Sequence, residues 1–158
     1  MEYDVDIRRL SSAFFKAYPT SDFPEIMVKS ARPYTCLIIE THEDYLICVP
    51  FRSSIRHNDA FLFKNTHRAR ITRSGLDYKK VILIKDMSYI DSDKSVVVDN
   101  DEYRSAITNI EQIVNEVHSY ILGYVDHVSG INSMHEREFE RHYRYSTLAY
   151  FHSVLGLE

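Results

Sequence analysis

Residues 34–64, YTCLIIETHEDYLICVPFRSSIRHNDAFLFK, contain the pattern that decides the fold. Two apolar runs, residues 34–40 and 45–51, lie on either side of a short polar segment. Such an arrangement predicts a β-hairpin. Pro50 has no backbone N–H, so it ends the second strand or places it at an edge. AFLFK, at residues 60–64, predicts a third strand after a connection with an unusual set of polar side chains.

The sequence on both sides of this stretch predicts further elements. Residues 65–75 form an irregular basic connection, and residues 76–86 (LDYKKVILIKD) predict a fourth strand because they are rich in β-branched residues. Residues 94–99 (KSVVVD) are a candidate fifth strand. At the N-terminus, Ile7, Leu10 and Phe14 recur at helical spacing and predict a helix over residues 6–18.

The C-terminal part predicts two longer helices. The first begins at an N-cap formed by Asn100 or Asp101 and has an apolar stripe of Tyr103, Ile107, Ile110, Val114, Val117 and Ile121. Gly130 lies in the break that follows, and residues 133–155 predict the last helix. Residues 1–158 are therefore expected to form one α+β domain, with a twisted, barrel-like antiparallel sheet and flanking helices.

Composition limits the possible functions. The chain has 158 residues, 44% of them hydrophobic, which is ordinary for a globular protein. Only four glycines are present, and none forms a Gly-rich phosphate loop, so Walker and Rossmann chemistry are excluded. Cys36 and Cys48 lie in apolar runs and are expected to be buried, reduced thiols. No signal peptide or membrane-length apolar segment is found, so a cytoplasmic protein is expected.

Charge is distributed unevenly along the chain, although the net charge is only −4. Residues 52–80 contain eight Lys or Arg side chains against two acids, and residues 86–126 contain nine acids against two basic residues. The basic segment is suited to an anionic partner such as a nucleic acid, because the local field matters more than the net charge. A solvated polar face is the alternative, and charge alone leaves both open.

The connection between the second and third predicted strands has more charged and hydrogen-bonding side chains than a turn needs. Arg52 and Arg56 match a phosphate with paired N–H groups and keep their charge near neutral pH. Ser53 and Ser54 can donate to phosphate oxygens, and His57 can transfer a proton near neutrality. In RNA the 2′-hydroxyl beside each phosphate is already a nucleophile, so cleavage needs no metal. We expect neither a metal site nor a cofactor; surface salt bridges are the alternative role for the arginines.

Three short motifs in a fixed order extend this interpretation. They are PFRS (residues 50–53), AFLFK (residues 60–64) and SGLDY (residues 74–78). In this order they resemble the TenpIN family of type III toxin–antitoxin toxins, which is akin to the ToxN and AbiQ endoribonucleases. The resemblance is clearest over residues 36–85, about a third of the chain. Elsewhere only the general layout of helices agrees.

The resemblance implies a compact, twisted antiparallel barrel of the Kid/MazF kind with added helices. It also implies sequence-selective, metal-independent RNA cleavage that leaves a 2′,3′-cyclic phosphate and a 5′-hydroxyl. The implied partner is an antitoxin RNA of tandem repeats, which the toxin itself cuts and whose pseudoknots block the site. Toxin and RNA would close into a cyclic assembly, in systems that commonly stop growth on phage infection or plasmid loss.

The turn departs from the family pattern. ToxN-like toxins have a Thr-Ser-Pro-Lys type of turn after the strand-ending proline, with its hydroxyls and lysine in the active site. Here Ser53 matches the serine, Arg52 stands in place of the threonine, and Arg56 is the nearest cation to the lysine. Because arginine is a poor general acid or base, we expect His57 to transfer one proton. Arg52 and Arg56 would then hold the phosphate and Ser53 would orient it.

A second group of residues is expected to bind RNA: Lys29, Arg32, Tyr34, Ser54, Lys64, His67, Arg68, Arg70, Lys79 and Arg141. The first three precede the hairpin, where the family places RNA-binding residues. Arg141 lies on an arginine-bearing face of the last predicted helix, where salt bridges to neighbouring glutamates are the alternative. Asp77 and Tyr78 are expected to set a turn instead.

Two other classes of function fit the same sequence. An RNA-binding module without catalysis would use the basic segment, with tyrosines that stack on unpaired bases. A protein-interaction domain would use the acidic helix to bind a basic partner.

Overall fold

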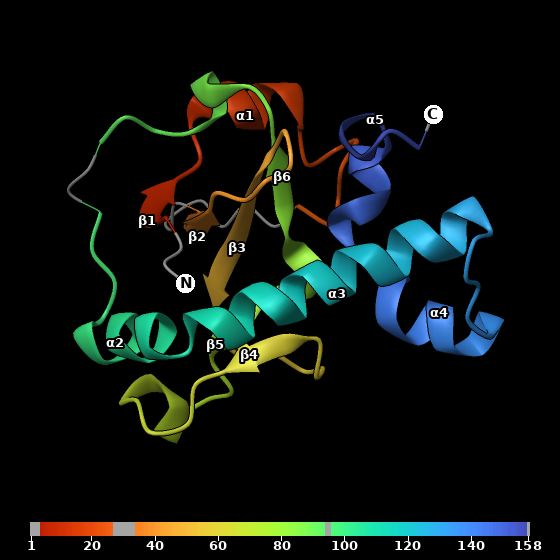
Figure 1. Cartoon of the computed structure of the whole chain (residues 1–158). Helices are drawn as coiled ribbons and strands as arrows, with labels where there is room; N and C mark the ends of the chain where they lie inside the picture. The colour runs from red at the N-terminus through yellow and green to blue at the C-terminus, as the bar shows by residue number, and fades with distance from the viewer. Residues whose placement is uncertain (1–3, 27–33, 94–95, 158) are drawn as a thin grey trace.

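The strands form an open antiparallel sheet with helices around it, as seen in the computed structural model, which describes residues 4–26, 34–93 and 96–157 (Figure 1). The order is β1-β2-β3-β5-β4, and β6 also pairs with β3. The strands are β1 (Val5–Arg9), β2 (Thr35–Ile39), β3 (Leu46–Arg52), β4 (Ala60–Leu62), β5 (Gly75–Asp77) and β6 (Ile82–Ile84). The predicted α+β class is confirmed. Within the described residues the sheet does not close into a barrel, because its end strands β1 and β4 are not paired.

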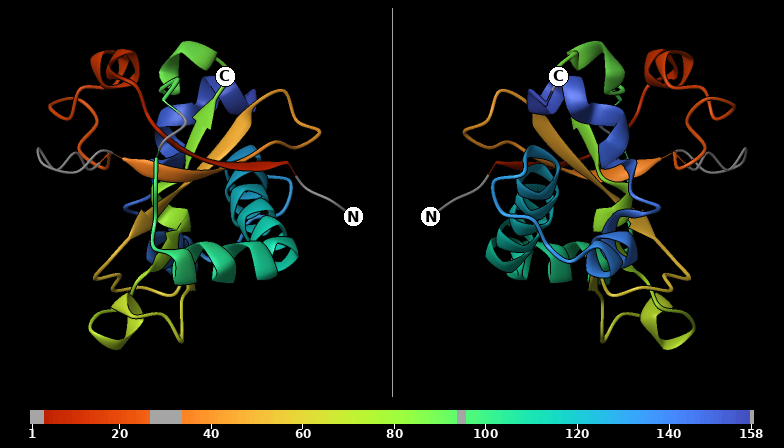
Figure 2. Two further views of the ribbon diagram at one scale, coloured as in Figure 1. Left: turned by 90° about the vertical axis from the view of Figure 1, so that its left-hand side faces the viewer. Right: turned by 90° about the vertical axis from the view of Figure 1, so that its right-hand side faces the viewer.

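The helices lie on more than one side of this sheet, with α1 and α5 toward one end and α2, α3 and α4 toward the other (Figures 1 and 2). They are α1 (Ser12–Ala17), α2 (Asn100–Thr108), α3 (Ile110–Ser129), α4 (Glu136–Tyr143) and α5 (His152–Leu155). The described part of the chain also forms the 3-10 turns η1 (Arg68–Arg70), η2 (Tyr78–Lys80), η3 (Met87–Tyr89) and η4 (Thr147–Phe151). Buried side chains of α3 and η4 join the same core as the central strands.

The predicted hairpin is the centre of the sheet. β2 and β3 pair antiparallel, with Leu37 opposite Val49 and Ile39 opposite Ile47. Successive residues of β3 are buried, so protein covers both of its faces, as a continuous apolar run predicts. Cys36 and Cys48 are buried and free, which confirms the expectation for the thiols.

The predicted fourth strand is two short strands joined by a 3-10 turn. β6 pairs with the first half of β3, and β5 pairs with its end, where Arg52 lies opposite Gly75. Between them the side chain of Asp77 accepts from the Lys79 N–H at 3.0 Å and caps η2. The prediction of one uninterrupted strand over residues 76–86 is therefore wrong. Because of this interruption, Tyr78, Lys79 and Lys80 form a 3-10 turn and not an extended strand.

The prediction of a helix over residues 6–18 is also wrong for the first half of that range. Residues Val5–Arg9 form β1, with Ile7 opposite Leu37 of β2. The Asp6 and Arg8 side chains form an ion pair at 2.8 Å. Side chains two residues apart lie on the same face of a strand but not of a helix, so this pair fits a strand. The helix begins only after Ser11, whose hydroxyl accepts from the Phe14 N–H.

The C-terminal helices are shorter than predicted. The helix expected to follow Asn100 is divided at Asn109 into α2 and α3, and its N-cap is Asp99. Gly130 ends α3 in the left-handed conformation, so the predicted break is confirmed. The long helix expected over residues 133–155 is instead α4, η4 and α5 in succession. Residues 96–99 of the candidate fifth strand are not a strand.

One glycine is fixed by contact between strands. A Cβ atom at Gly75 would lie 2.1 Å from the carbonyl oxygen of Phe61 on β4. Only glycine therefore allows β4 and β5 to pair at this position, which places the connection before β4 beside the end of β3. No helix in the part of the chain that the structure describes is long and apolar enough to cross a membrane.

Candidate functional site

The connection between β3 and β4 is held against the segment that precedes β5. Ile55 is buried at its middle, and its N–H donates to the carbonyl of Arg73 at 2.9 Å. Ser54 has a φ of 56°, and its N–H donates to the hydroxyl of Thr72 at 2.9 Å. Side chains on either side of Ile55 therefore have defined positions although the connection has no regular structure.

Arg52 and His57 converge on one buried carboxylate. The side chain of Asp77 is completely buried, with Arg52 Nη1 2.8 Å from its Oδ2 and His57 Nε2 3.1 Å from its Oδ1. Burying a carboxylate is costly unless it is paired and hydrogen-bonded, and here two side chains and the Lys79 N–H supply those contacts. The structure thus brings together two of the four predicted catalytic residues. The expected turn-setting role of Asp77 is confirmed, since its carboxylate caps η2.

Both ring nitrogens of His57 have partners. Nδ1 accepts from the backbone N–H of Asp59 at 3.1 Å, so the proton of the neutral ring is on Nε2, facing Asp77. A substrate proton can reach Nδ1 only when the Asp59 contact opens. In this arrangement His57 holds the turn together, and its ring is 22% exposed.

Arg56 and Ser53 are the more available members of the predicted set. Arg56 is exposed, and within residues 4–26, 34–93 and 96–157 its side chain has no hydrogen bond or ion pair. Ser53 is half-buried and its hydroxyl is likewise unbonded in the same described ranges. Beside the fixed guanidinium of Arg52, these groups leave one free cation and one hydroxyl for an anion.

A second histidine–carboxylate pair lies next to the first. Nδ1 of His142, on α4, is 2.9 Å from both carboxylate oxygens of Asp59. Lys79 Nζ lies 3.9 Å from the same carboxylate and donates to the Arg141 carbonyl at 2.9 Å. The Asp59 residue therefore connects both histidines, through its N–H to His57 and through its side chain to His142. Neither Asp59 nor His142 was predicted from the sequence to belong to the site.

A cavity of about 510 Å³ opens beside this second pair. The connection before β4, α3 and α4 form its walls, and Asp59, Tyr120 and His142 are among the residues that line it. Burial raises the pKa of the Tyr120 hydroxyl well above its ordinary value, so this group stays neutral and donates to the His142 carbonyl at 2.7 Å. The cavity is thus lined by hydroxyls and amides together with the carboxylates of Asp59, Glu116 and Glu138 and the hydrogen-bonded ring of His142.

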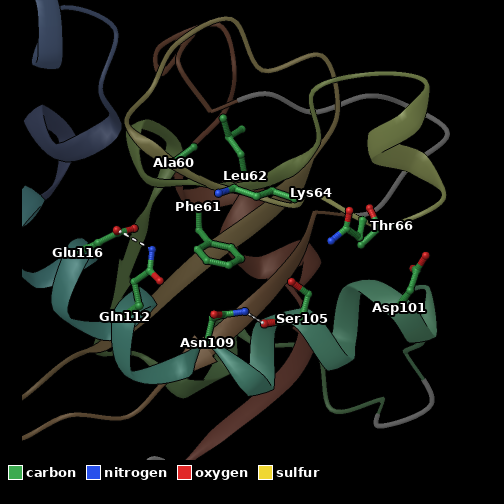
Figure 3. Close-up of a pocket in the computed structure, with 11 residues that line it drawn as sticks. Ala60, Phe61, Leu62, Lys64, Thr66, Asp101, Ser105, Asn109, Gln112 and Glu116 are labelled. Carbon is green, nitrogen blue, oxygen red and sulfur yellow. Dashed lines mark hydrogen bonds between the residues drawn. The ribbon is translucent and has the colours of Figure 1, made fainter.

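A groove of about 420 Å³ continues from this cavity along β4 (Figure 3). The two hollows share Ala60 and Glu116. Figure 3 shows Phe61 directed from β4 toward the helices and Lys64 along the upper side of the groove. Asp101 lies at the far end of the lining.

The residues predicted to bind RNA fall into three groups. Lys29 and Arg32 lie outside the described residues. Ser54, Lys64, His67, Arg70 and Arg141 are exposed. Tyr34, Arg68 and Lys79 are held by other protein groups.

The contacts of the held group are internal. Tyr34 is buried and its hydroxyl donates to the Lys80 carbonyl at 2.8 Å, so its ring has no open face on which a base can stack. Burial also raises the pKa of the Tyr34 hydroxyl. Arg68 makes a two-point ion pair with Glu102, at 2.9 and 2.8 Å. Any role of Tyr34 or Arg68 in binding RNA requires these contacts to open.

Neither a metal centre nor a similarity to known proteins identifies this site. Among the residues that the structure describes, no group of three or more His, Cys, Asp or Glu side chains is placed to hold a metal ion. No family model, curated protein or solved structure matches the chain. The geometry of the turn and its two histidine–carboxylate pairs therefore carries the functional argument.

Proposed function

We propose that this protein is a metal-independent endoribonuclease and the toxin of a type III toxin–antitoxin system. The observation that carries the proposal is the convergence of Arg52 and His57 on the buried Asp77, which fixes the turn in which Ser53 and Arg56 have no side-chain partner among the described residues. The ordered motifs PFRS, AFLFK and SGLDY support it, because their resemblance to TenpIN toxins falls on this same part of the chain. We also propose that this open sheet is a divergent form of the Kid/MazF-type barrel that the resemblance implies.

The proposed reaction uses groups that the turn holds in place. The guanidinium groups of Arg52 and Arg56 neutralise the phosphate that gains negative charge as the 2′-oxygen attacks it. Ser53 donates to a phosphate oxygen and fixes its orientation. A bond forms between the 2′-oxygen and phosphorus while the bond from phosphorus to the 5′-oxygen breaks. The products are a 2′,3′-cyclic phosphate and a 5′-hydroxyl, and His57 transfers one proton through Nδ1 once its contact with Asp59 opens.

The proposed partner is the antitoxin RNA of the same system. Exposed cations at Lys64, Arg70 and Arg141 would contact its phosphates, and His67 lies in the same connection as the first two. The toxin would cut the tandem-repeat transcript into pseudoknots that then occupy its site in a cyclic assembly in the cytoplasm. Short tandem repeats in the DNA just upstream of the reading frame, followed by a terminator, are the expected genetic arrangement.

The decisive experiment is cleavage of RNA in excess EDTA. Purified protein is incubated with total RNA, and the 3′ ends are tested for cyclic phosphate. Arg56→Gln should lower the cleavage rate at least about 10-fold, because this side chain loses no hydrogen bond or ion pair to the described residues and acts on the phosphate. Arg104→Gln, an exposed arginine on α2, is the matched control and should cleave like the wild type. Intact RNA with the wild-type protein would overturn the proposal.

One observation favours a second candidate, an RNA-binding module without catalysis. Both ring nitrogens of His57 have protein partners, which is the arrangement expected of a structural histidine. The EDTA experiment separates the two candidates, because a binding module would retain RNA at low salt and leave it uncut. A protein-interaction domain would instead purify without RNA even at low salt.

A further inference from the structure

We infer that His142, oriented by Asp59, takes the 2′-hydroxyl proton in the proposed cleavage. The inference rests on the proposed function, since it names the proton acceptor for that reaction. Arginine cannot accept the proton near neutral pH, and His57 has no nitrogen without a partner. A different group has to do so if the turn keeps the arrangement observed.

The geometry of the Asp59–His142 pair is suited to this role. Both carboxylate oxygens of Asp59 lie 2.9 Å from Nδ1 of His142, so the ring proton is on Nδ1 and the lone pair is on Nε2. The nearest partner of Nε2 is the Arg141 guanidinium, at a long distance of 3.4 Å. The His142 ring is 32% exposed, whereas that of His57 is 22% exposed. A carboxylate on one ring nitrogen and a second nitrogen with only this long contact resemble the arrangement of the general-base histidine in catalytic triads.

The position of His142 also fits. Its cavity of about 510 Å³ is within the range of small-ligand sites and accommodates a ribose with its base. Asn58 lines this cavity and follows His57 directly, so the cavity begins where the arginine-bearing turn ends. In the inferred mode, a nucleotide with its phosphate at Arg56 places the sugar that carries the nucleophile in this hollow.

Each proton moved in this step has a donor and an acceptor. As the bond between the 2′-oxygen and phosphorus forms, the hydroxyl proton moves to Nε2 of His142. The bond to the 5′-oxygen breaks, and that oxygen takes its proton from solvent water, which replaces the transfer through His57 while the Asp59 contact of His57 stays closed. The His142 imidazolium then returns its proton to solvent. Asp59 stabilises the imidazolium while it exists, as a carboxylate on Nδ1 does in catalytic triads.

Charged groups from each neighbouring element surround the pair. They are Asp59 before β4, Lys79 on η2, Glu116 on α3, and Glu138 and Arg141 on α4. The hydroxyls of Tyr120 and Tyr143 stay neutral, because burial raises the pKa of each.

The test is the pH dependence of cleavage in EDTA under single-turnover conditions. His142→Gln should lower the rate about 100-fold or more and remove the fall in rate on the acidic side of the profile. Its affinity for uncleaved RNA should stay within about twofold of the wild type, because a neutral histidine contributes little to phosphate binding. The matched control is His118→Gln, a half-exposed histidine of α3 away from this cavity, which should behave as wild type.

The outcomes separate the inference from the proposed function. A wild-type protein that leaves RNA intact overturns the proposed function itself. Cleavage by the wild type, together with an unchanged rate and acidic limb in His142→Gln, overturns only the inference. If thermal melting shows that His142→Gln is unfolded, Asp59→Asn replaces it and should lower the rate at least about 10-fold. An unchanged profile in Asp59→Asn overturns the inference as well.

Discussion

The guanidinium of Arg68 and the buried carboxylate of Glu102 form a two-point ion pair at 2.9 and 2.8 Å. Glu102 is 1% exposed and lies in the first turn of α2, whereas Arg68 belongs to η1 in the basic connection after β4. This pair, together with the His67 N–H that donates to Asp101 at 2.7 Å, attaches the basic connection to the acidic helix. Opposite charges that are separate in the sequence are therefore partly neutralised within the fold.

Arg68→Gln should destabilise the protein by about 1–3 kcal/mol, because it leaves a buried carboxylate without its partner. The measurement is the free energy of unfolding from urea denaturation. Arg70→Gln removes an exposed arginine two residues away and should change this free energy by less than about 0.5 kcal/mol. Equal effects of the two substitutions would show that the ion pair does not stabilise the fold.

Glu102 should make stability depend on pH in a definite direction. Burial raises the pKa of its carboxyl above the ordinary value, although Arg68 opposes this shift. The folded protein then binds the Glu102 proton more tightly than the unfolded chain, so this contribution to stability is fully present below about pH 4 and is lost as pH rises through the folded pKa. The free energy of unfolding of wild type minus that of Glu102→Gln should therefore decrease from pH 4 to pH 7. A difference that stays constant or increases would contradict the assigned shift.

Gly75→Ala should be far more damaging than an alanine at a glycine of the surface. The new Cβ would lie 2.1 Å from the Phe61 carbonyl oxygen, so β4 and β5 have to separate and the turn before β4 moves with them. We expect a loss of more than about 3 kcal/mol in urea denaturation. Gly156→Ala is the control, since it meets no atom within 4 Å and costs only the strain of its φ of 71°, about 1 kcal/mol.

Each element that differs from its prediction does so for an identifiable physical reason. β2 and β3 were predictable because each is an apolar run beside a polar turn. The 3-10 turn η2 was not, because it depends on the carboxylate of Asp77, and that carboxylate is stabilised by side chains from another part of the chain. At the N-terminus, the spacing of Ile7, Leu10 and Phe14 suits a helix, but pairing with β2 favours a strand up to Arg9.

The candidate site shows the same limit. Arg52 and His57 belong to one connection, so their proximity followed from the sequence. Asp59 and His142 are 83 residues apart, and no spacing rule relates the connection before β4 to α4. Only the packing of α4 against α3 and η2 brings the second pair together. The sequence shows that the basic connection carries arginines. It does not show which of them is ion-paired, because the partner, Glu102, lies on α2.

If the basic connection binds RNA, its exposed and paired arginines should differ in salt dependence. Arg70 is exposed, so Arg70→Gln should weaken RNA binding equally for all sequences and lower the slope of log Kd against log salt by about 1. The measurement is fluorescence anisotropy with a labelled single-stranded RNA at several salt concentrations. Arg104→Gln, on the acidic side, is the control. An unchanged slope in Arg70→Gln would remove this residue from the RNA path.

Asp77→Asn tests whether the buried carboxylate organises the turn. The amide keeps the shape but cannot neutralise Arg52, whose Nη1 lies 2.8 Å from the carboxylate, and its NH2 group competes with the His57 Nε2–H contact. Because a half-buried guanidinium then loses its only ion-pair partner among the described residues, we expect a loss of about 2–4 kcal/mol in urea denaturation. The double variant Arg52→Met, Asp77→Asn removes the unpaired charge together with its partner, so it should be more stable than Asp77→Asn alone. If the double variant instead loses as much as the two single variants combined, Arg52 and Asp77 act independently, and the turn owes its shape to the buried Ile55 instead.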